Sequence, residues 1–175
     1  RWLLRNRNIQ FYESEIRAID LAGKKVVLSH LELDYDFLVL GLGSVTNFFG
    51  VPKAESFTFP VKTLREAMAI KYRILDSFSR AEAELKPEAR RKLLSFIVVG
   101  GGATGVELAS SMHDLFHKIL ARDYPRINPT DVGLFVAEAG PALLAGMDPG
   151  MGRIALSKLR VQGVDMHLGT RISGV

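Results

Sequence analysis

The chain has 175 residues, of which 47% are hydrophobic and 24% charged, and its formal net charge is +4. This is a globular composition that excludes a disordered chain, and neither a signal peptide nor an apolar run of the ~18 residues that cross a membrane is present. Because cysteine is absent, a disulfide framework, a thiolate metal site and a cysteine nucleophile are excluded within this sequence.

The first fifty residues have the pattern of short strands. The chain begins at Arg1 and strand-like sequence follows almost at once, so we expect an internal piece of a longer protein. Residues 10–19 alternate and end at the turn sequence Asp20-Leu21-Ala22-Gly23, and residues 25–29 are the predicted hairpin partner. Residues 35–40 form an almost continuous apolar run that ends in glycines, which predicts a strand buried on both faces of a parallel sheet.

A long helix is predicted after the irregular segment between Pro52 and Pro60. Thr63 and Glu66 have capping-box spacing, so the hydroxyl can accept from a free amide while the carboxylate reaches back. An apolar face then continues for about six turns. Its members are Leu64, Ala67, Met68, Ile74, Leu75, Phe78 and Leu85. This face indicates core packing rather than a cofactor contact, and Pro87 is predicted to end the helix.

Strand and helix patterns alternate over the rest of the chain. The one tight basic run, Arg90-Arg91-Lys92, is expected to be a solvated turn, and since the other basic residues are scattered we expect no nucleic-acid partner. The predicted elements are a strand at 93–99, a helix at about 102–121 with Val106, Ala109, Phe116 and Ile119 inward, a strand at 132–137, a helix at 150–162 and a strand at 164–168. This order is one mononucleotide-binding half of a doubly wound α/β sheet.

A glycine-rich loop joins the first of these strands to its helix. Gly100, Gly102 and Gly105 have the GxGxxG spacing, in which the first glycine makes a tight turn, the second admits a pyrophosphate and the third lets helix and strand pack closely. The amino end of the helix adds free amides and a partial positive charge. The residues predicted to bind a dinucleotide are therefore Gly100, Gly101, Gly102, Ala103, Thr104 and Gly105. A glycine-rich turn without a ligand is the alternative.

Two acidic residues accompany this loop. Glu138 closes the second strand, where its carboxylate can hydrogen-bond the adenosine ribose and would repel a 2′-phosphate, which favours NADH over NADPH. It lies farther from Gly105 than the usual ~20 residues, which the long helix and the loop at 122–130 explain. A solvated strand-end glutamate is the alternative. Glu107 is predicted in the first helix turn. A carboxylate at this position can be a partner of the helix dipole or a functional group, and the sequence alone does not separate the two roles.

Two histidines have the spacing of a zinc-binding motif. His113 and His117 stand four residues apart on one helix, as in zinc-binding helices. The helix already belongs to the dinucleotide fold, and His30 and His167 lie in distant strand segments. We therefore expect surface histidines and no metal site.

Several segments together resemble a known family. The residues that carry the likeness are 37–52, 59–64, 100–107, 138–141, 143–144 and 147–149, with Asn47-Phe48-Phe49-Gly50 and Lys62-Thr63 the most specific. They resemble the type II, non-proton-pumping NADH:quinone oxidoreductases of the pyridine nucleotide-disulfide oxidoreductase superfamily, which are flavoproteins with two dinucleotide-binding domains. The resemblance covers nearly the whole chain.

The resemblance implies an α/β fold made of a partial FAD-binding domain and the Rossmann-like βαβαβ unit of an NADH domain. Residues 1–59 would belong to the FAD domain, residues 60–90 to the crossover with its long helix, and residues 91–175 to the first part of the NADH domain. The residues implied to lie against FAD are Ile16, Gly41, Gly43, Ser44 and Thr46. Glu107 matches a family glutamate near the nicotinamide and is the catalytic candidate. Leu42 departs from the threonine common in the superfamily, which removes one hydroxyl contact to flavin.

The implied activity is hydride transfer from NADH to FAD, with electrons passed on to a quinone in a respiratory chain. The implied place is the cytoplasmic side of the cell membrane, attached peripherally through segments outside this chain, and a homodimer is left open. The chain alone is expected to be inactive, because the remaining flavin motifs are not in it. The alternatives are another FAD-dependent NAD(P)H reductase (of the ferredoxin, rubredoxin, nitrite or sulfide:quinone type) and a non-catalytic dinucleotide-binding module.

Overall fold

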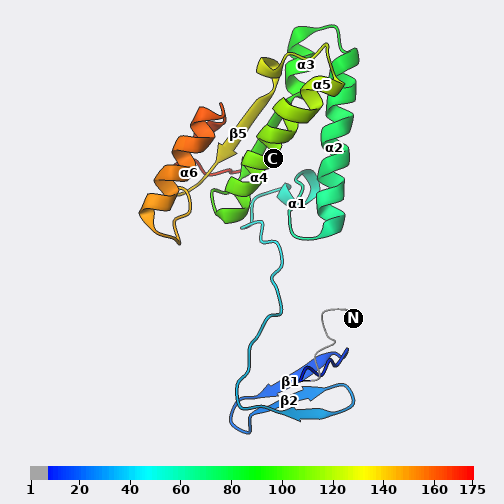
Figure 1. The fold of residues 1–175 in the computed structure, drawn as a ribbon, viewed down its shortest axis with the longest axis vertical. Coiled ribbons are helices and arrows are strands. Elements are labelled where there is room, and N and C mark those ends of the chain that lie inside the picture. Colours follow the sequence, from blue (N-terminus) through cyan, green and yellow to red (C-terminus); the bar gives the residue numbers. More distant parts are fainter. Residues whose placement is uncertain (1–7) are drawn as a thin grey trace. The chain divides into compact units, whose positions relative to one another are not determined.

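The computed structural model describes residues 8–175, which divide after Ser44 into two compact units. Each unit contains one three-stranded sheet, antiparallel in the first and parallel in the second (Figure 1). Within residues 8–175, no helix has both the length and the apolar character needed to cross a membrane.

The first unit is built on a short antiparallel meander. Strands β1 (Ile16–Asp20), β2 (Lys25–Leu28) and β3 (Glu32–Asp34) are hydrogen-bonded in that order. The carboxylate of Asp20 accepts from the backbone N–H groups of Ala22 and Gly23 at 3.0 and 2.8 Å, which fixes the tight turn between the first two strands. The predicted hairpin is therefore confirmed, although β1 begins at Ile16 rather than near residue 10.

The strand predicted at residues 35–40 is wrong. This segment has no regular secondary structure, and its side chains Phe37 and Val39 are 93% and 90% exposed. A strand that is buried on both faces needs hydrogen-bonding neighbours at its edges and a packed layer on each side. Among the described residues, no strand pairs with this segment; its first residue, Tyr35, donates its N–H to the Lys24 carbonyl at 3.0 Å, and the segment continues without a partner strand.

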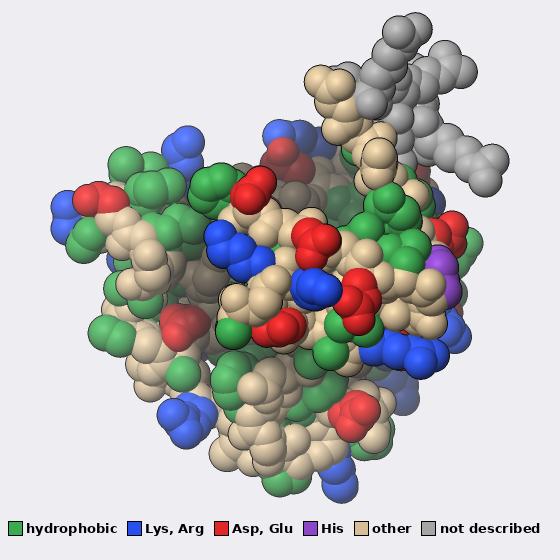
Figure 2. Space-filling view, turned by 90° about the horizontal axis from the view of Figure 1, so that it is seen from below, with side chains coloured by type: hydrophobic (Ala, Val, Ile, Leu, Met, Phe, Trp, Pro, Cys, Tyr) green, Lys and Arg blue, Asp and Glu red, His purple; other side chains and the backbone are tan. Residues whose placement is uncertain are grey.

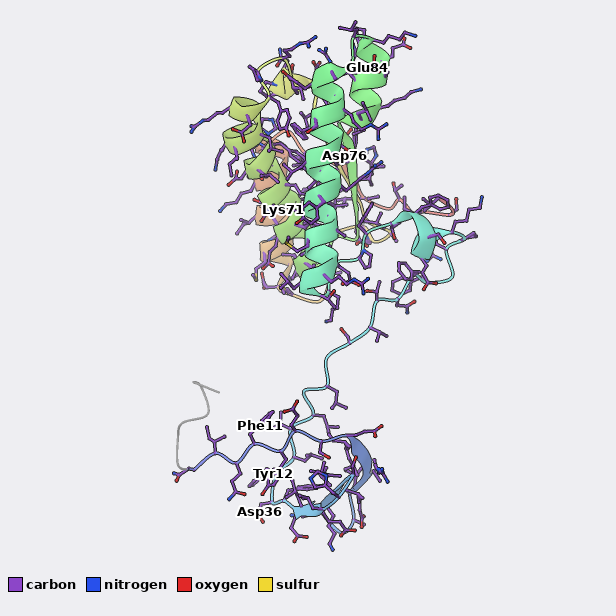
Figure 3. All side chains as sticks on the ribbon, turned by 90° about the vertical axis from the view of Figure 1, so that its right-hand side faces the viewer. Phe11, Tyr12, Asp36, Lys71, Asp76 and Glu84 are labelled. Carbon is purple, nitrogen blue, oxygen red and sulfur yellow. The ribbon has the colours of Figure 1, made fainter. Side chains whose placement is uncertain are left out.

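The second unit opens with the short helix α1 (Ala54–Phe57) and the long helix α2 (Leu64–Ala83). The capping box is confirmed: Thr63 Oγ1 accepts from the Glu66 N–H at 3.2 Å, and Glu66 Oε2 accepts from the Thr63 N–H at 2.7 Å. Such a cap stabilises a helix by about 1 kcal/mol. Figure 3 follows α2 from Lys71 through Asp76 to Glu84 at its end.

The packed part of α2 begins at Ile70, which is partly buried against the core. Ile74, Phe78 and Ala81 are buried, whereas Leu64 and Leu85, at the ends of the predicted apolar face, are 81% and 77% exposed. The helix ends at Ala83, before Pro87.

Pro87 begins a new helix, α3 (Pro87–Leu93), instead of only ending the previous one. Proline is favoured at a first helical position because it has no N–H to leave unpaired. Arg90, Arg91 and Lys92 lie in the last turn of α3, where cations complement the helix dipole. The turn predicted for this basic run is therefore wrong, although Arg91 and Lys92 are exposed, in agreement with the prediction that the run is solvated.

The parallel sheet contains β4 (Ser95–Val99), β5 (Gly133–Ala137) and β6 (Asp165–His167) in that order. Helix α4 (Ala103–Asp114) connects the first pair of strands and α6 (Pro149–Val161) connects the second (Figure 1). A 3-10 turn (Pro129–Asp131) leads into β5. The predicted strand–helix–strand–helix–strand order and the parallel sheet are confirmed.

The helix after the glycine-rich loop changes its pitch midway. Helix α4 passes into a π-helical segment (Leu115–Leu120) and then into α5 (Ala121–Asp123). A π-helix bonds residues five apart rather than four, so it shifts the phase of the side chains that follow. Ile119, predicted to face inward, is 54% exposed, and Leu120 is buried in its place.

An aromatic cluster lies at the centre of the second unit. Phe78 of α2 and Phe96 of β4 both contact Phe116, with ring centroids 5.4 and 4.8 Å apart, and Tyr124 lies 5.6 Å from Phe78. These separations are those of favourable aromatic pairs. The cluster joins α2 to the sheet and to the π-helical segment, and so fixes the strand that carries the glycine-rich loop.

Charges of both signs are interspersed over the surface seen in Figure 2. On α2 the carboxylate of Asp76 lies 3.6 and 3.5 Å from the guanidinium groups of Arg73 and Arg80. Lys118, and after it His113, hold the pKa of the Asp114 carboxyl below its usual range. Apart from the half-buried His113 these side chains lie largely in solvent, where such pairs contribute little to stability.

Candidate dinucleotide-binding site

The glycine-rich loop turns sharply out of β4 and into α4. Gly100 has a φ of +107°, which favours glycine, and its N–H donates to the Ala137 carbonyl of β5 at 2.8 Å. A Cβ built on Gly105 would overlap the carbonyl oxygen of Gly100, so helix and loop can approach only because residue 105 is glycine. The geometry agrees with the roles predicted for the first and third motif glycines.

The amino end of α4 presents free donors. Gly102 is the N-cap residue and no side chain caps the helix, so the first amides have no partner within the helix. A Cβ built on Gly102 has nothing within 4 Å, which leaves open space beside these amides. The positive end of the helix dipole adds to their attraction for an anion.

Glu138 lies against this loop. It follows β5 directly, and its Oε2 accepts from the Gly101 N–H at 2.6 Å while its Oε1 accepts from the Gly140 N–H at 2.5 Å. The sequence pattern predicts both Glu138 and Gly101 as nucleotide-binding residues. The fold brings these two residues into contact, because they follow adjacent parallel strands. A carboxylate that accepts two amides still has lone pairs for a further donor such as a sugar hydroxyl.

The end of the third strand joins the same region. The Glu138 N–H donates to the His167 carbonyl and its own carbonyl accepts from the Thr170 N–H, each at 2.9 Å. The carboxyl ends of β4, β5 and β6 therefore meet around Glu138. In open parallel sheets, ligands bind at the carboxyl ends of the strands.

Glu107 is placed differently from the prediction. Because α4 begins at Ala103 and contains no acidic residue in its first turn, Glu107 lies in the second turn and is exposed. It is too far along the helix to partner the free amides at the helix end. Its assignment near a nicotinamide stays a prediction.

His113 and His117 stack on each other, with ring centroids 4.3 Å apart. The Nδ1 atom of His117 lies 3.0 Å from the His113 carbonyl oxygen, and the Nδ1 atom of His113 lies 3.3 Å from an Asp114 oxygen. Over residues 8–175, no group of three or more potential ligands is assembled for a metal ion.

The residues assigned to flavin lie in the amino-terminal part of the chain. Ile16 begins β1, and Gly41, Gly43, Ser44 and Thr46 lie in the irregular segment between β3 and α1. Gly43 has a φ of +75° and open space where a Cβ would stand. The flavin assignment of these residues rests on the family resemblance alone.

Sequence reasoning missed the segment that supports the loop from β5. Leu144 donates its N–H to the Gly101 carbonyl at 2.9 Å and has a φ of +54°, while the buried Leu143 lies against Gly101. Two signals in the sequence point to it: residues 143–144 are among those that carry the family resemblance, and Gly101 is a glycine which the motif does not require.

Comparison with known proteins gives three kinds of match. The family model of the pyridine nucleotide-disulphide oxidoreductases matches residues 4–175. An external alternative NAD(P)H-ubiquinone oxidoreductase of Arabidopsis thaliana mitochondria is 32% identical over 188 residues, with 100% of this chain and 32% of the relative covered. A type II NADH:quinone oxidoreductase of Mycobacterium tuberculosis is 34% identical, with 99% of this chain and 38% of the relative covered.

The solved structures agree on the fold. The NDH2 structure from Plasmodium falciparum in complex with NADH superposes with a TM-score of 0.76 at 22% identity, covering 98% of this chain and 36% of that one. A ferredoxin reductase from Rhodopseudomonas palustris has a TM-score of 0.57 at 22% identity, over 93% of this chain and 33% of that one. The chain spans about a third of the length of the curated relatives it matches.

Proposed function

The chain belongs to the pyridine nucleotide-disulphide oxidoreductase family, and from this membership we propose that it forms part of a flavin-dependent NADH dehydrogenase that reduces a quinone. The observation that carries the proposal is the contact between Glu138 and the glycine-rich loop at the carboxyl ends of the parallel strands. The site has a free helix end for a pyrophosphate and, beside it, a carboxylate for a ribose.

In this proposal the backbone amides from Gly102 to Gly105 bind the pyrophosphate of NADH. The open space at Gly102 fits a phosphate close to the backbone, and the uncapped end of α4 fits its charge. Glu138 receives hydrogen bonds from the adenosine ribose with the lone pairs that the two amides leave free. Glu107 is proposed to help orient the nicotinamide ring.

NADH is the proposed form of the nucleotide. A 2′-phosphate would meet the negative charge of Glu138, which favours NADH. The Arabidopsis relative is named for NAD(P)H and the mycobacterial one for NADH, so the carboxylate is the feature that decides between them here.

FAD is the proposed second cofactor, held in part by Ile16, Gly41, Gly43, Ser44 and Thr46 within residues 1–59. Residues 60–90 would form the crossover, and residues 91–175 the first part of the NADH domain. When bound, the flavin accepts the hydride of NADH and passes two electrons to a quinone, which takes up two protons. The protein's part is to align the nicotinamide and to keep both nucleotides in place.

The quinone is proposed from the relatives that are 32% and 34% identical, both of which are named for a quinone acceptor. Because such acceptors are soluble in lipid, we propose peripheral attachment on the cytoplasmic side of the cell membrane as part of a respiratory chain. A homodimer is compatible with this arrangement.

The proposal is tested on the purified, flavin-loaded full-length protein that contains this chain, by following NADH oxidation with a soluble quinone. We expect quinone-dependent turnover and a preference for NADH over NADPH. Activity with an iron–sulfur protein but not with quinone would assign the chain to another reductase. A colourless protein without flavin would favour a non-catalytic dinucleotide-binding module.

A further inference from the structure

Gly101, the middle one of three consecutive glycines, is hydrogen-bonded to other parts of the protein through both its N–H and its carbonyl group. Gly101 donates its N–H to Glu138 Oε2 at 2.6 Å and accepts at its carbonyl from the Leu144 N–H at 2.9 Å. Both of its backbone polar groups are thus occupied by the segment that follows β5. Gly102, the next residue, has open space around it.

Gly101 is also enclosed. A Cβ built on it would lie 2.5 Å from Leu143 Cδ2 and 3.0 Å from Glu138 Cγ, and Leu143 is itself only 2% exposed. The φ of Gly101 is not among the positive ones, so glycine is required here for space rather than for backbone freedom. A side chain at residue 101 would push the glycine-rich loop away from β5.

The segment after β5 adopts an uncommon conformation to make these contacts. Leu144 has a φ of +54°, a region that a leucine enters only when its surroundings hold it there. In this conformation its N–H points at Gly101 while its carbonyl accepts from the Met147 N–H at 2.8 Å. Gly152 of α6 permits the close approach of the Leu143 carbonyl.

The carboxylate of Glu138 accepts hydrogen bonds from both glycine-containing loops. One oxygen holds Gly101 and the other holds Gly140, so a single side chain ties the loop after β4 to the loop after β5. Only a carboxylate can accept at both ends, because an amide offers one acceptor and one donor group.

We propose that residues 138–144 form a latch on Gly101, which sets the glycine-rich loop in its nucleotide-binding shape before any nucleotide is present. Gly101 is then a loop-anchoring residue rather than a phosphate ligand. Glu138 is a positioning residue for the loop as well as a ligand for the ribose. The nucleotide part of this inference rests on the proposed function, whereas the latch does not.

The latch is tested by amide hydrogen exchange of the flavin-loaded protein in the absence of NADH. We expect Glu138→Gln and Gly101→Ala to speed exchange over residues 100–106 by about ten-fold or more, as the loss of a charge-assisted hydrogen bond implies. Gly102→Ala is the matched control, because its methyl group enters open space and leaves this exchange at the wild-type rate. If Gly101→Ala fails to fold, Glu138→Gln, which keeps the size of the side chain, decides the question.

Wild-type exchange in Glu138→Gln would overturn the latch and leave Glu138 as a ribose ligand only. Equal loss of protection in Gly102→Ala would overturn it as well, since it would make the loop sensitive to any added methyl group.

Steady-state kinetics separates the latch from the proposed function. All three variants should raise the KM for NADH several-fold while the kcat at saturating NADH changes by less than about two-fold, as for a loss of uniform binding. Faster exchange in Glu138→Gln and Gly101→Ala with unchanged KM values would uphold the latch and refute the nucleotide site. A fall of kcat alone would contradict a positioning role.

Discussion

The two regions that the sequence assigns to nucleotides differ in how far each is assembled within residues 8–175. Around β4, β5 and β6, the glycine-rich loop, Glu138 and the strand ends are joined by hydrogen bonds into one site. Residues 35–46 carry an equally strong apolar and glycine pattern, yet they form no strand, and Phe37 and Val39 are almost fully exposed.

The difference teaches what a local pattern requires in order to form structure. The strand at β4 has its neighbour β5 and its covering helices within the next seventy residues or so, as expected for a βαβ unit. The apolar run at 35–40 predicts a strand that would need a neighbouring strand on each side. Within the described residues the run directly follows β3, and no strand lies beside it. Hydrophobicity alone does not make a strand when no edge is available for pairing.

The largest expected effect is in the aromatic cluster. Phe116→Ala should lower the free energy of unfolding by about 3–5 kcal/mol, because Phe116 is buried against Phe78 and Phe96. Phe37→Ala is the control and should cost no more than about 0.5 kcal/mol, since Phe37 is exposed. Chemical denaturation of the 175-residue chain measures both. A comparable loss in Phe37→Ala would mean that residues 35–46 are packed, and would remove the contrast between the regions.

The glycines offer the same contrast at a smaller scale. Gly105→Ala forces a methyl group onto the Gly100 carbonyl and should destabilise the chain by about 1–3 kcal/mol. Gly41→Ala has open space and no left-handed backbone, so it should leave stability unchanged. Thermal unfolding of the two variants provides the comparison, and equal stability of both would contradict the close packing at Gly105.

A change of charge at Glu138 tests which nucleotide this region binds. Glu138→Arg should lower the ratio of kcat/KM for NADH to that for NADPH by at least about ten-fold, or ~1.4 kcal/mol. The kcat/KM should fall with both nucleotides through a higher KM, because the arginine cannot hold Gly101. Flavin content, which we propose to depend on the other region, should not change. An unaltered affinity for NADH would take Glu138 out of the site.

The smallest expected effect is on the pH dependence of stability, and it concerns helix α2, which lies between the two regions in the sequence. The hydrogen bond from the Thr63 backbone, ahead of that from Lys62, holds the pKa of the Glu66 carboxyl below its usual range. A lowered pKa stabilises the folded chain above the usual glutamate range, and this contribution disappears as the pH falls through the lowered pKa. Glu66→Gln keeps an acceptor but cannot titrate, so its unfolding curves should show a weaker acid dependence than wild type. Identical acid dependence would mean that the ionisation of the Glu66 carboxyl is not coupled to the stability of the fold.

Much of the candidate site could be predicted because its signals are local. The spacing of Gly100, Gly102 and Gly105 between a strand and a helix, and an acidic residue at the end of the next strand, follow from the geometry of a βαβ unit. The capping box at Thr63 was predictable for the same reason, since its two partners are three residues apart.

The errors came from features that depend on distant contacts or on small changes of helical phase. A continuous α-helix places Ile119 inward, but one π-helical segment places Leu120 inward instead. Arg90, Arg91 and Lys92 were assigned to a turn because their seven-residue helix is too short to show an apolar period.

The sequence by itself thus determined the βαβαβ order, the glycine-rich loop and its acidic partner. The loop follows from a fixed local spacing of glycines, and the acidic partner from its place at the end of the next strand. Only the tertiary structure decided that Gly101 is enclosed by Leu143, that Leu144 adopts a left-handed backbone to reach it, and that one carboxylate holds two loops. These contacts join residues about forty positions apart, as parallel strands with helical crossovers require. No spacing rule along the chain encodes such distances, because the helix and loop between the strands can vary in length.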